Sequence, residues 1–209
     1  MRSFEYPRPD CPPQVVFTGP LLENSDEAFT PPAWWGDLDD STVVHVTQGT
    51  ISNDPAQLLR PALEALANEP VLVVACTGRI DEGGEALGLL PANARLASYV
   101  PYGALLPKTS LVLTNGGFQG VQAVLSHGIP MVTAGDSEDK PEVCARLQRT
   151  GASIDLGTAN PAPAAIRSAV RRVLNEPGFR AAANALAREA ADAGGAVGAV
   201  DAIEAALKQ

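Results

Sequence analysis

The run Thr-Asn-Gly-Gly-Phe-Gln-Gly at positions 114–120 has the composition of a turn that binds phosphate. A buried, apolar segment precedes it, and a segment with helical periodicity, 118–126, follows it. The first backbone N–H groups of a helix have no partner within the helix, and the helix dipole makes that end positive. Gly116, Gly117 and Gly120 have no side chain that would block a close approach. The pattern therefore predicts a helix start suited to a phosphate group.

A second glycine-containing loop, residues 48–53, follows the apolar segment Val43–Val46. In a parallel sheet both loops would open at the same edge and could hold one ligand between them. Neither loop has the G-x-G-x-x-G spacing of a dinucleotide site, and no Lys-Ser or Lys-Thr pair follows the glycines as in a P-loop. Glycines also end strands for ordinary turn reasons, so the residues alone leave a ligand site and a pair of simple turns both open.

The acidic run 136–139, Asp-Ser-Glu-Asp, offers carboxylates that could hold a divalent cation. We expect instead a solvated acidic loop and predict no metal site. A further interpretation is that Asp139 and Lys140 contact a neutral ligand rich in hydroxyl groups, because a carboxylate accepts hydrogen bonds and an ammonium group donates them.

The histidines and cysteines do not suggest a catalytic or metal-binding set. His45 lies inside a predicted strand and is expected in the core or behind a site, and His127 ends the 118–126 helix, where it can interact with the helix dipole. No Ser/His/Asp or Cys/His arrangement is suitably placed, so no complete nucleophilic site is predicted. The three cysteines lack metal-ligand spacing and are expected to be reduced thiols of a cytoplasmic protein: Cys11, Cys76 and Cys144.

Strand-like and helical segments alternate from residue 42 onward. The segments that predict strands are Val43–Val46, Val71–Cys76, Ala94–Ser98, Leu111–Leu113, Met131–Thr133 and Ser153–Leu156. Helices are expected from Pro55, with Asp54 as N-cap, over Phe118–Ser126, over Pro141–Thr150, and from Asn160 to the end. This alternation predicts an α/β fold with a doubly wound parallel sheet of about six strands and a helical C-terminus.

Residues 1–41 are expected to form an irregular linker or strap, and residues 42–209 a single domain. Prolines interrupt the first segment so often that only Gln14–Thr18 could form a short strand. Trp34 and Trp35 are expected to hold this strap over the domain as hydrophobic anchors, in preference to stacking on a ligand.

The chain has 209 residues, a net charge of −9 and a pI of about 4.7. This balance disfavours nucleic acid and anionic lipid as partners, but it does not exclude a nucleotide bound by local backbone dipoles. No apolar run approaches the roughly 18 residues of a membrane span. The first ten residues lack the apolar core of a signal peptide, so we predict a cytoplasmic protein without a membrane span.

Five spaced motifs occur in an order that resembles a known family. They are Val-Thr-Gln-Gly-Thr at 46–50, Tyr-Val-Pro at 99–101, Leu-Leu-Pro-Lys-Thr-Ser-Leu-Val-Leu-Thr-Asn-Gly-Gly-Phe at 105–118, Leu-Ser-His-Gly-Ile-Pro-Met-Val at 125–132, and Glu-Asp-Lys-Pro-Glu-Val-Cys-Ala-Arg at 138–146. From about Thr42 to Lys208 the chain resembles the C-terminal, donor-binding domain of family 1 glycosyltransferases. These GT-B enzymes use nucleotide-diphosphate sugars and include UDP-glucosyltransferases of natural products and sterols. The resemblance implies a Rossmann-like half of a GT-B fold.

The resemblance also implies which residues bind the donor. They are Gly49, Thr50, Tyr99, Val100, Asn115, Gly116, Gly117, Phe118, Gln119, Gly120, Asp139 and Lys140. In the family, the first two contact the diphosphate or the sugar. The aromatic residue stacks on the base, and its successor reads the edge of the base through its backbone. The glycine-rich run grips the diphosphate, and the last two positions bind hydroxyl groups of the sugar.

Four positions depart from the family pattern. Asn115 stands where histidine is usual, and Ala123 where a glutamate often binds the ribose. Tyr102 replaces a common glutamine, and Lys140 replaces a common amide. The resemblance by itself therefore leaves the base and the sugar open.

The function implied by the resemblance is inverting, metal-independent transfer of a hexose from a UDP- or TDP-sugar to a hydroxyl of a small-molecule acceptor, with no cofactor besides the donor substrate. Family members supply the catalytic base from an N-terminal acceptor-binding domain, to which nothing here corresponds. We therefore expect no catalytic residue in this chain and a need for that domain or a partner chain. Two alternatives stay open: a non-catalytic nucleotide-sugar-binding module, and an enzyme of the sugar-nucleotide epimerase type.

Overall fold

The structure is a computed structural model that describes residues 1–22, 29–49, 54–78 and 87–208. Its centre is one sheet of six parallel strands in the order β3-β2-β1-β4-β5-β6. The strands are β1 (Val43–Thr47), β2 (Leu72–Cys76), β3 (Ala94–Ala97), β4 (Leu111–Thr114), β5 (Met131–Thr133) and β6 (Ser153–Asp155). The predicted fold class and the positions of all six strands are confirmed.

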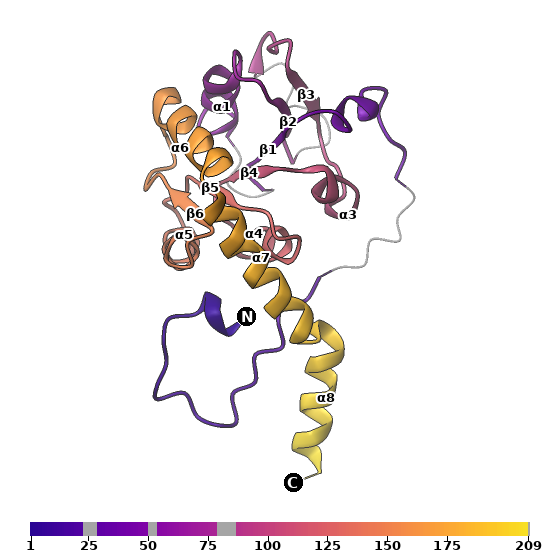
Figure 1. Cartoon of the computed structure of the whole chain (residues 1–209), viewed down its shortest axis with the longest axis vertical. Helices are drawn as coiled ribbons and strands as arrows, with labels where there is room; N and C mark the ends of the chain where they lie inside the picture. Colours follow the sequence, from indigo (N-terminus) through magenta and orange to yellow (C-terminus); the bar gives the residue numbers. More distant parts are fainter. Residues whose placement is uncertain (23–28, 50–53, 79–86, 209) are drawn as a thin grey trace.

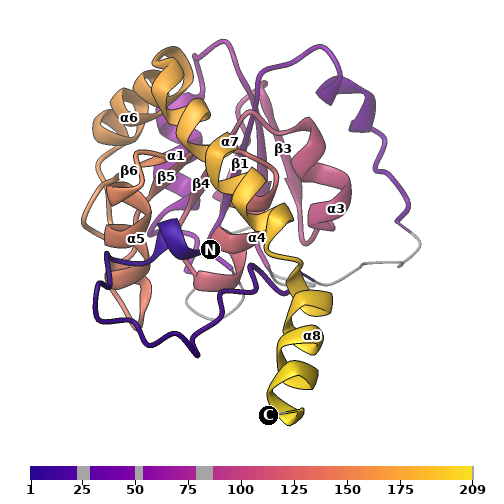
Figure 2. The ribbon, with the colours of Figure 1, turned by 60° about the horizontal axis from the view of Figure 1, so that its bottom comes forward.

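Helices cover both faces of this sheet (Figures 1 and 2). The α-helices are α1 (Leu59–Leu66), α3 (Tyr102–Leu105), α4 (Phe118–Ser126), α5 (Lys140–Arg149), α6 (Pro163–Asn175), α7 (Pro177–Asp192) and α8 (Gly195–Leu207). Short 3-10 helices are η1 (Arg2–Phe4), η2 (Trp35–Leu38) and η3 (Leu106–Lys108). None of the helices within the described ranges is long and apolar enough to cross a bilayer.

Alternation along each strand assigns its side chains to the two faces. Val44 and Val46 of β1 join the core beneath α1 and α6. Val43, on the opposite face, packs with Leu105 of α3, and Val112 of β4 packs with α4, α5 and α7. All five residues of β1 are buried, as expected for a central parallel strand with helices on both sides.

The strand order reverses direction between β1 and β4. The chain runs outward from β1 to β2 and β3, then returns to place β4 on the other side of β1. Open α/β sheets bind ligands in the crevice beyond the carboxyl ends of the strands at such a point. The two glycine-containing loops predicted to share a ligand follow β1 and β4, the two strands that flank this crevice.

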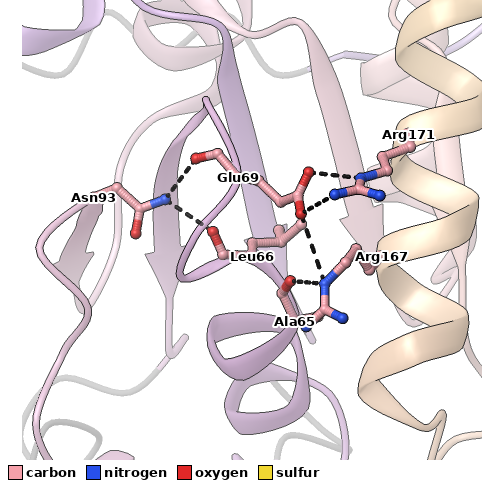
Figure 3. Close-up of polar contacts among 6 residues, drawn as sticks. All are labelled: Ala65, Leu66, Glu69, Asn93, Arg167 and Arg171. Carbon is pink, nitrogen blue, oxygen red and sulfur yellow. Dashed lines mark hydrogen bonds and ion pairs between the residues drawn. The ribbon is translucent and has the colours of Figure 1, made fainter.

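At the amino ends of the strands, a polar network joins the sheet to its neighbouring helices (Figure 3). Arg171 of α6 donates two hydrogen bonds of 2.8 Å to the Glu69 carboxylate, and Arg167 donates to the carbonyl of Ala65 at 2.8 Å. Asn93, which precedes β3, donates from Nδ2 to the carbonyls of Leu66, Glu69 and Val71. These contacts join the α1–β2 connection to α6 and to β3.

In its described residues, the N-terminal segment has the short helices η1 and η2 and no strand. Phe4 is buried against α4 and α5, and the Ser3 N–H donates to Glu189 of α7 at 3.0 Å. Trp34 and Trp35 pack against the apolar cluster on the β1 and β2 side, which supports the anchoring interpretation. The strand expected over Gln14–Thr18 is absent, and that prediction was wrong: the segment lies apart from the sheet and has no strand neighbour.

The start of α1 also differs from the prediction. The regular helix begins at Leu59, and Asp54 caps only a turn, its Oδ1 accepting from the Ala56 N–H at 3.0 Å. Pro61 has no N–H to donate to the carbonyl four residues earlier, so the ladder that would extend the helix back to Pro55 is broken. The Leu59 N–H instead donates to the Gln48 side chain at 3.2 Å.

Candidate functional site

The glycine-rich turn after β4 is shaped by close contacts. Gly116 has a φ of 84°, and a Cβ atom there would lie 2.3 Å from Sγ of Cys144 on α5. A Cβ atom on Gly135, after β5, would lie 2.0 Å from the carbonyl oxygen of Asn115. Only glycine fits at either position, so the loops after β4 and β5 approach more closely than side chains would allow.

Helix α4 begins directly at this turn. Gly117 is its N-cap with a φ of −60° and no side-chain cap, and the Val121 N–H makes the first bond back, to the Gly117 carbonyl at 3.0 Å. The N–H groups of the preceding helical positions, Phe118 to Gly120, have no such partner inside α4. They point toward the carboxyl edge of the sheet together with the positive end of the helix dipole.

Asn115 joins this turn to the loop after β1. Its Nδ2 donates to the backbone carbonyl of Gln48 in a short contact. The Gln48 side chain is 2 % exposed and bonds at both ends: its Nε2 donates to the Asp54 carbonyl at 2.9 Å, and its Oε1 accepts from the Leu59 N–H. Gln48 is a structural member of the site that sequence reasoning missed, and its position just before Gly49 was the only signal.

The two residues expected to bind the sugar hydroxyls are placed differently from each other. Asp139 is the N-cap of α5 and is exposed. Lys140, at the first position of α5, is 5 % exposed and contacts Glu138 closely and Ser137 Oγ at 3.4 Å. Lys140 also lines a small cleft together with Gln48, Gly135 and Asn115.

A cavity of about 290 Å³ opens beside α4. Its lining residues come from the strap, from α3 and its preceding loop, and from α4: Leu21, Leu22, Tyr99, Tyr102, Gly103, Gln119, Gly120, Ala123 and His127. Tyr99 is 64 % exposed, so its ring is available to a base, whereas Val100 is buried. Leu21 and Leu22 were not predicted as site residues.

Behind the cavity, the lining residue Tyr102 packs against the buried His45, and neither side chain is charged at neutral pH. His45 is 1 % exposed and donates from Nδ1 to the Val74 carbonyl at 3.0 Å, and burial lowers its pKa to about 4. Its ring meets the Tyr102 ring edge to face at 5.9 Å. Burial raises the pKa of Tyr102 to about 12, and the nearby Thr47 side chain opposes this shift only in part. Neither side chain can act as an acid or base near pH 7, and His45 is a core residue as predicted.

Other predicted residues lie around these features. The Phe118 ring is half-exposed and packs edge to face on Phe4 at 6.2 Å, which turns it toward the strap. Gly49 has a φ of 70°, and no atom of the described residues would lie within 4 Å of a Cβ there; Thr50 lies outside the described residues. His127 is the C-cap of α4 and donates from Nδ1 to the Ala123 carbonyl at 3.0 Å, as expected for a residue at the negative end of a helix.

The described part of the chain contains no group of three or more His, Cys, Asp or Glu side chains that could hold a metal ion. The acidic residues of the 136–139 loop do not converge there: the Asp136 carboxylate accepts from the Ala159 N–H at 2.9 Å, and Glu138 turns to Lys140. The three cysteines are free thiols.

Comparison with known proteins identifies the family. Residues 63–204 match the family described as "Erythromycin biosynthesis protein CIII-like, C-terminal domain". The chain belongs to this family. Among its curated relatives are 4'-demethylrebeccamycin synthase of Lentzea aerocolonigenes, 50 % identical over 97 % of the chain, and UDP-glucosyltransferase A1 of Starmerella bombicola, 41 % identical over 90 % of it. The EryCIII-like chain spans 47 % and 41 % of their lengths, respectively, so it covers about half of such a protein.

Solved structures agree with this membership. The calicheamicin glycosyltransferase CalG4 superposes with a TM-score of 0.83 at 25 % identity, covering 99 % of the chain and 52 % of that protein. The spinosyn rhamnosyltransferase SpnG in complex with thymidine diphosphate gives 0.78 at 25 % identity, with 97 % and 54 % covered. The resemblance to the C-terminal, donor-binding domain of GT-B glycosyltransferases is confirmed.

Proposed function

We propose that this EryCIII-like chain binds the donor in the inverting, metal-independent transfer of a hexose from a UDP- or TDP-sugar to a hydroxyl of a small-molecule acceptor. The observation that supports this most directly is the proximity of two features. The start of α4 faces the β1/β4 crevice, and the cavity with the exposed Tyr99 ring lies along the same helix. A base against Tyr99 would place its diphosphate near the first turn of α4.

The chemistry of the site follows from this placement. When the bond between sugar and diphosphate breaks, negative charge develops on the departing phosphate. Oriented N–H groups of the first turn of α4, with the Asn115 amide beside them, would stabilise that charge in the transition state. The acceptor hydroxyl must lose a proton, and neither His45 nor His127 is placed to take it. As the family resemblance implies, we propose that the base comes from the acceptor-binding half.

The names of relatives and solved neighbours bear on which nucleotide the donor sugar carries. Relatives include proteins named as UDP-glucosyltransferases, whereas a solved neighbour at 25 % identity is a complex with thymidine diphosphate. We accordingly propose a UDP- or TDP-hexose as donor. We also propose a cytoplasmic location, which the free thiols of the chain support.

Helix α8 supplies a surface for the acceptor-binding half. None of its residues is buried, and it extends away from the rest of the fold in both views (Figures 1 and 2). Val197, Val200, Ile203 and Leu207 are each more than half exposed and form an apolar stripe. We propose that this stripe packs against the acceptor-binding half.

Nucleotide binding tests the donor proposal. We expect calorimetric titration of the chain with UDP and TDP to show binding in the micromolar to millimolar range. Tyr99→Ala should weaken it by about tenfold through loss of stacking, whereas Tyr99→Phe should not. The control Tyr6→Ala removes an aromatic ring on the strap outside the cavity and should have no effect. Absence of binding to both nucleotides at millimolar concentration would refute the proposal.

Joining the chain with an acceptor-binding half tests whether it needs that half, and it distinguishes an enzyme from a non-catalytic binding module. The chain would be co-expressed with the N-terminal half of 4'-demethylrebeccamycin synthase, whose C-terminal half it resembles at 50 % identity. We expect a complex that Ile203→Asp disrupts and that the exposed neighbour Asp201→Asn leaves intact. Transfer from a UDP-sugar by the complex would support the enzyme. A stable complex that binds UDP without transfer would instead favour a non-catalytic module, and conversion of the UDP-sugar without acceptor an epimerase.

A further inference from the structure

The Lys140 side chain is a buried cation at the candidate donor site. Only 5 % of the residue is exposed, although an ammonium group is costly to remove from water unless it is paired. Its Nζ has two contacts, the Glu138 carboxylate and the Ser137 hydroxyl at 3.4 Å. The charge is therefore balanced by a single carboxylate two residues earlier in the same loop.

That carboxylate is held loosely. About half of the Glu138 side chain is exposed to solvent, so it can return to water at little cost. Its backbone has a φ of 58°, a conformation that residues other than glycine rarely adopt. The loop thus bends unfavourably to bring this carboxylate to the ammonium group. The other carboxylates of the loop are placed differently: Asp136 accepts from the Ala159 N–H, and Asp139, at the N-cap position of α5, is exposed and makes no side-chain capping bond.

Lys140 lies beside the turn that starts α4. Its Cβ lies 3.1 Å from the point where a Cβ of Gly135 would be, and such a Cβ would also meet the Asn115 carbonyl. Lys140, Asn115 and Asp136 line one small cleft beside this turn. The Asn115 amide already donates to the Gln48 carbonyl, so the ammonium group and the positive end of the α4 dipole are the two features here that favour a bound anion.

We propose that Lys140 binds the diphosphate of the donor and that Glu138 occupies its ammonium group only while the donor is absent. This inference rests on the proposed function of the site and assigns Lys140 to the leaving group, whereas the family resemblance assigned it to sugar hydroxyls. A hydroxyl needs only a neutral amide, but a diphosphate makes charge-assisted bonds that balance the buried ammonium. Asp139, exposed at the start of α5, is left for the sugar.

Binding of UDP and of uridine to matched variants tests the assignment. Lys140→Gln should lower the affinity for UDP by about tenfold or more and leave the affinity for uridine unchanged, because only UDP carries the diphosphate. Glu138→Gln should raise the affinity for UDP several-fold, because it removes the carboxylate that competes for Lys140. In the Lys140→Gln background the Glu138→Gln change should have no effect. Lys108→Gln and Glu142→Gln, which change the same charges elsewhere, serve as controls.

The outcomes separate this inference from the proposed function. If the unmodified chain binds neither UDP nor TDP, the donor site itself is refuted. If the chain binds UDP, but Lys140→Gln lowers only the affinity for a UDP-sugar and not that for UDP, then Lys140 contacts the sugar hydroxyls. This result would overturn the inference. If Glu138→Gln and the unmodified chain bind UDP with equal affinity, Glu138 does not compete with the diphosphate for Lys140. Glu138 is half-exposed, so this variant should fold even if loss of the buried Lys140 charge disturbs the structure.

Discussion

Asn115 donates a hydrogen bond from its side-chain amide to the backbone carbonyl of Gln48, and so joins the ends of the two strands between which the sheet order reverses. The Gln48 side chain extends this connection to the start of α1 through the Leu59 N–H. One buried amide pair thus fixes the relative position of three loops at the carboxyl edge. Changes at Asn115 should therefore affect nucleotide binding through geometry as well as charge.

We first predict that Asn115→Asp weakens UDP binding by about tenfold or more. The variant has the same shape, but a carboxylate cannot donate to the Gln48 carbonyl and would repel a diphosphate at the start of α4. Asn115→His keeps a donor and is the usual family residue, so it should retain most of the affinity. Calorimetric titration of both variants with UDP checks this prediction. Equal UDP affinities of Asn115→Asp and Asn115→His would contradict it.

A second prediction concerns the turn before α4. Gly116→Ala should lower the free energy of unfolding by about 3 kcal/mol, because the new Cβ meets Cys144 Sγ and the φ of 84° disfavours alanine. The matched control is Gly117→Ala, at a φ of −60° with nothing nearer than 4.0 Å, which should cost less than about 1 kcal/mol.

Urea unfolding of the single and double variants measures this difference. Adding Cys144→Ala to Gly116→Ala should recover part of the loss, since it removes the atom in conflict and leaves only the backbone strain. Strictly additive effects of the two substitutions would show that the close contact does not exist.

The third prediction is a pH dependence of stability from His45. Burial lowers its pKa from the ordinary 6.5 to about 4, so between these values the unfolded chain binds a proton that the folded chain does not. This contribution is present in full above pH 6.5 and is lost as the pH falls to about 4, amounting to about 3 kcal/mol.

His45→Asn provides the comparison, because asparagine can still donate to the Val74 carbonyl but does not titrate. Free energies of unfolding at pH 7.5, 5.5 and 4.5 should fall less steeply in this variant than in the unmodified chain. The same slope in both proteins would show that other groups cause the acid sensitivity.

A fourth prediction addresses the network in Figure 3. Asn93→Asp should destabilise the fold by about 2–4 kcal/mol, because a carboxylate would face the carbonyls of Leu66, Glu69 and Val71 to which Nδ2 now donates. Asn68→Asp changes the same group in the α1–β2 connection without those bonds and should be nearly neutral. Thermal unfolding would show the contrast, and similar midpoints for both variants would rule out this role.

The parts of the fold with strong local signals were predictable from the sequence. Helix α4 has the predicted bounds Phe118–Ser126 because glycines precede it and a Gly-Ile-Pro stop follows it. Strand β5 was placed equally well, between that stop and the acidic loop. In contrast, α1 starts later than expected, because Pro61 and the distant Gln48 decide its first turn.

Within the candidate site, the predicted residues of the β4 turn and of α5 gather at one edge, whereas their partners could not be inferred. The pairing of Lys140 with Glu138 depends on a left-handed backbone that the loop sequence does not specify. Leu21 and Leu22 reach the cavity by a path through an irregular segment without periodicity. Long-range contacts of this kind leave no local pattern to detect.

Under the proposed function, the two strap leucines would influence the release of the nucleotide. Leu21 and Leu22 form one wall of the cavity beside Tyr99, yet they belong to a segment outside the sheet and its helices. A shift of that segment would open the wall and loosen the spent nucleotide without any change in the helix that faces its phosphates. The rate at which the nucleotide departs would then be governed by the covering segment, and the strength of its grip by the helix.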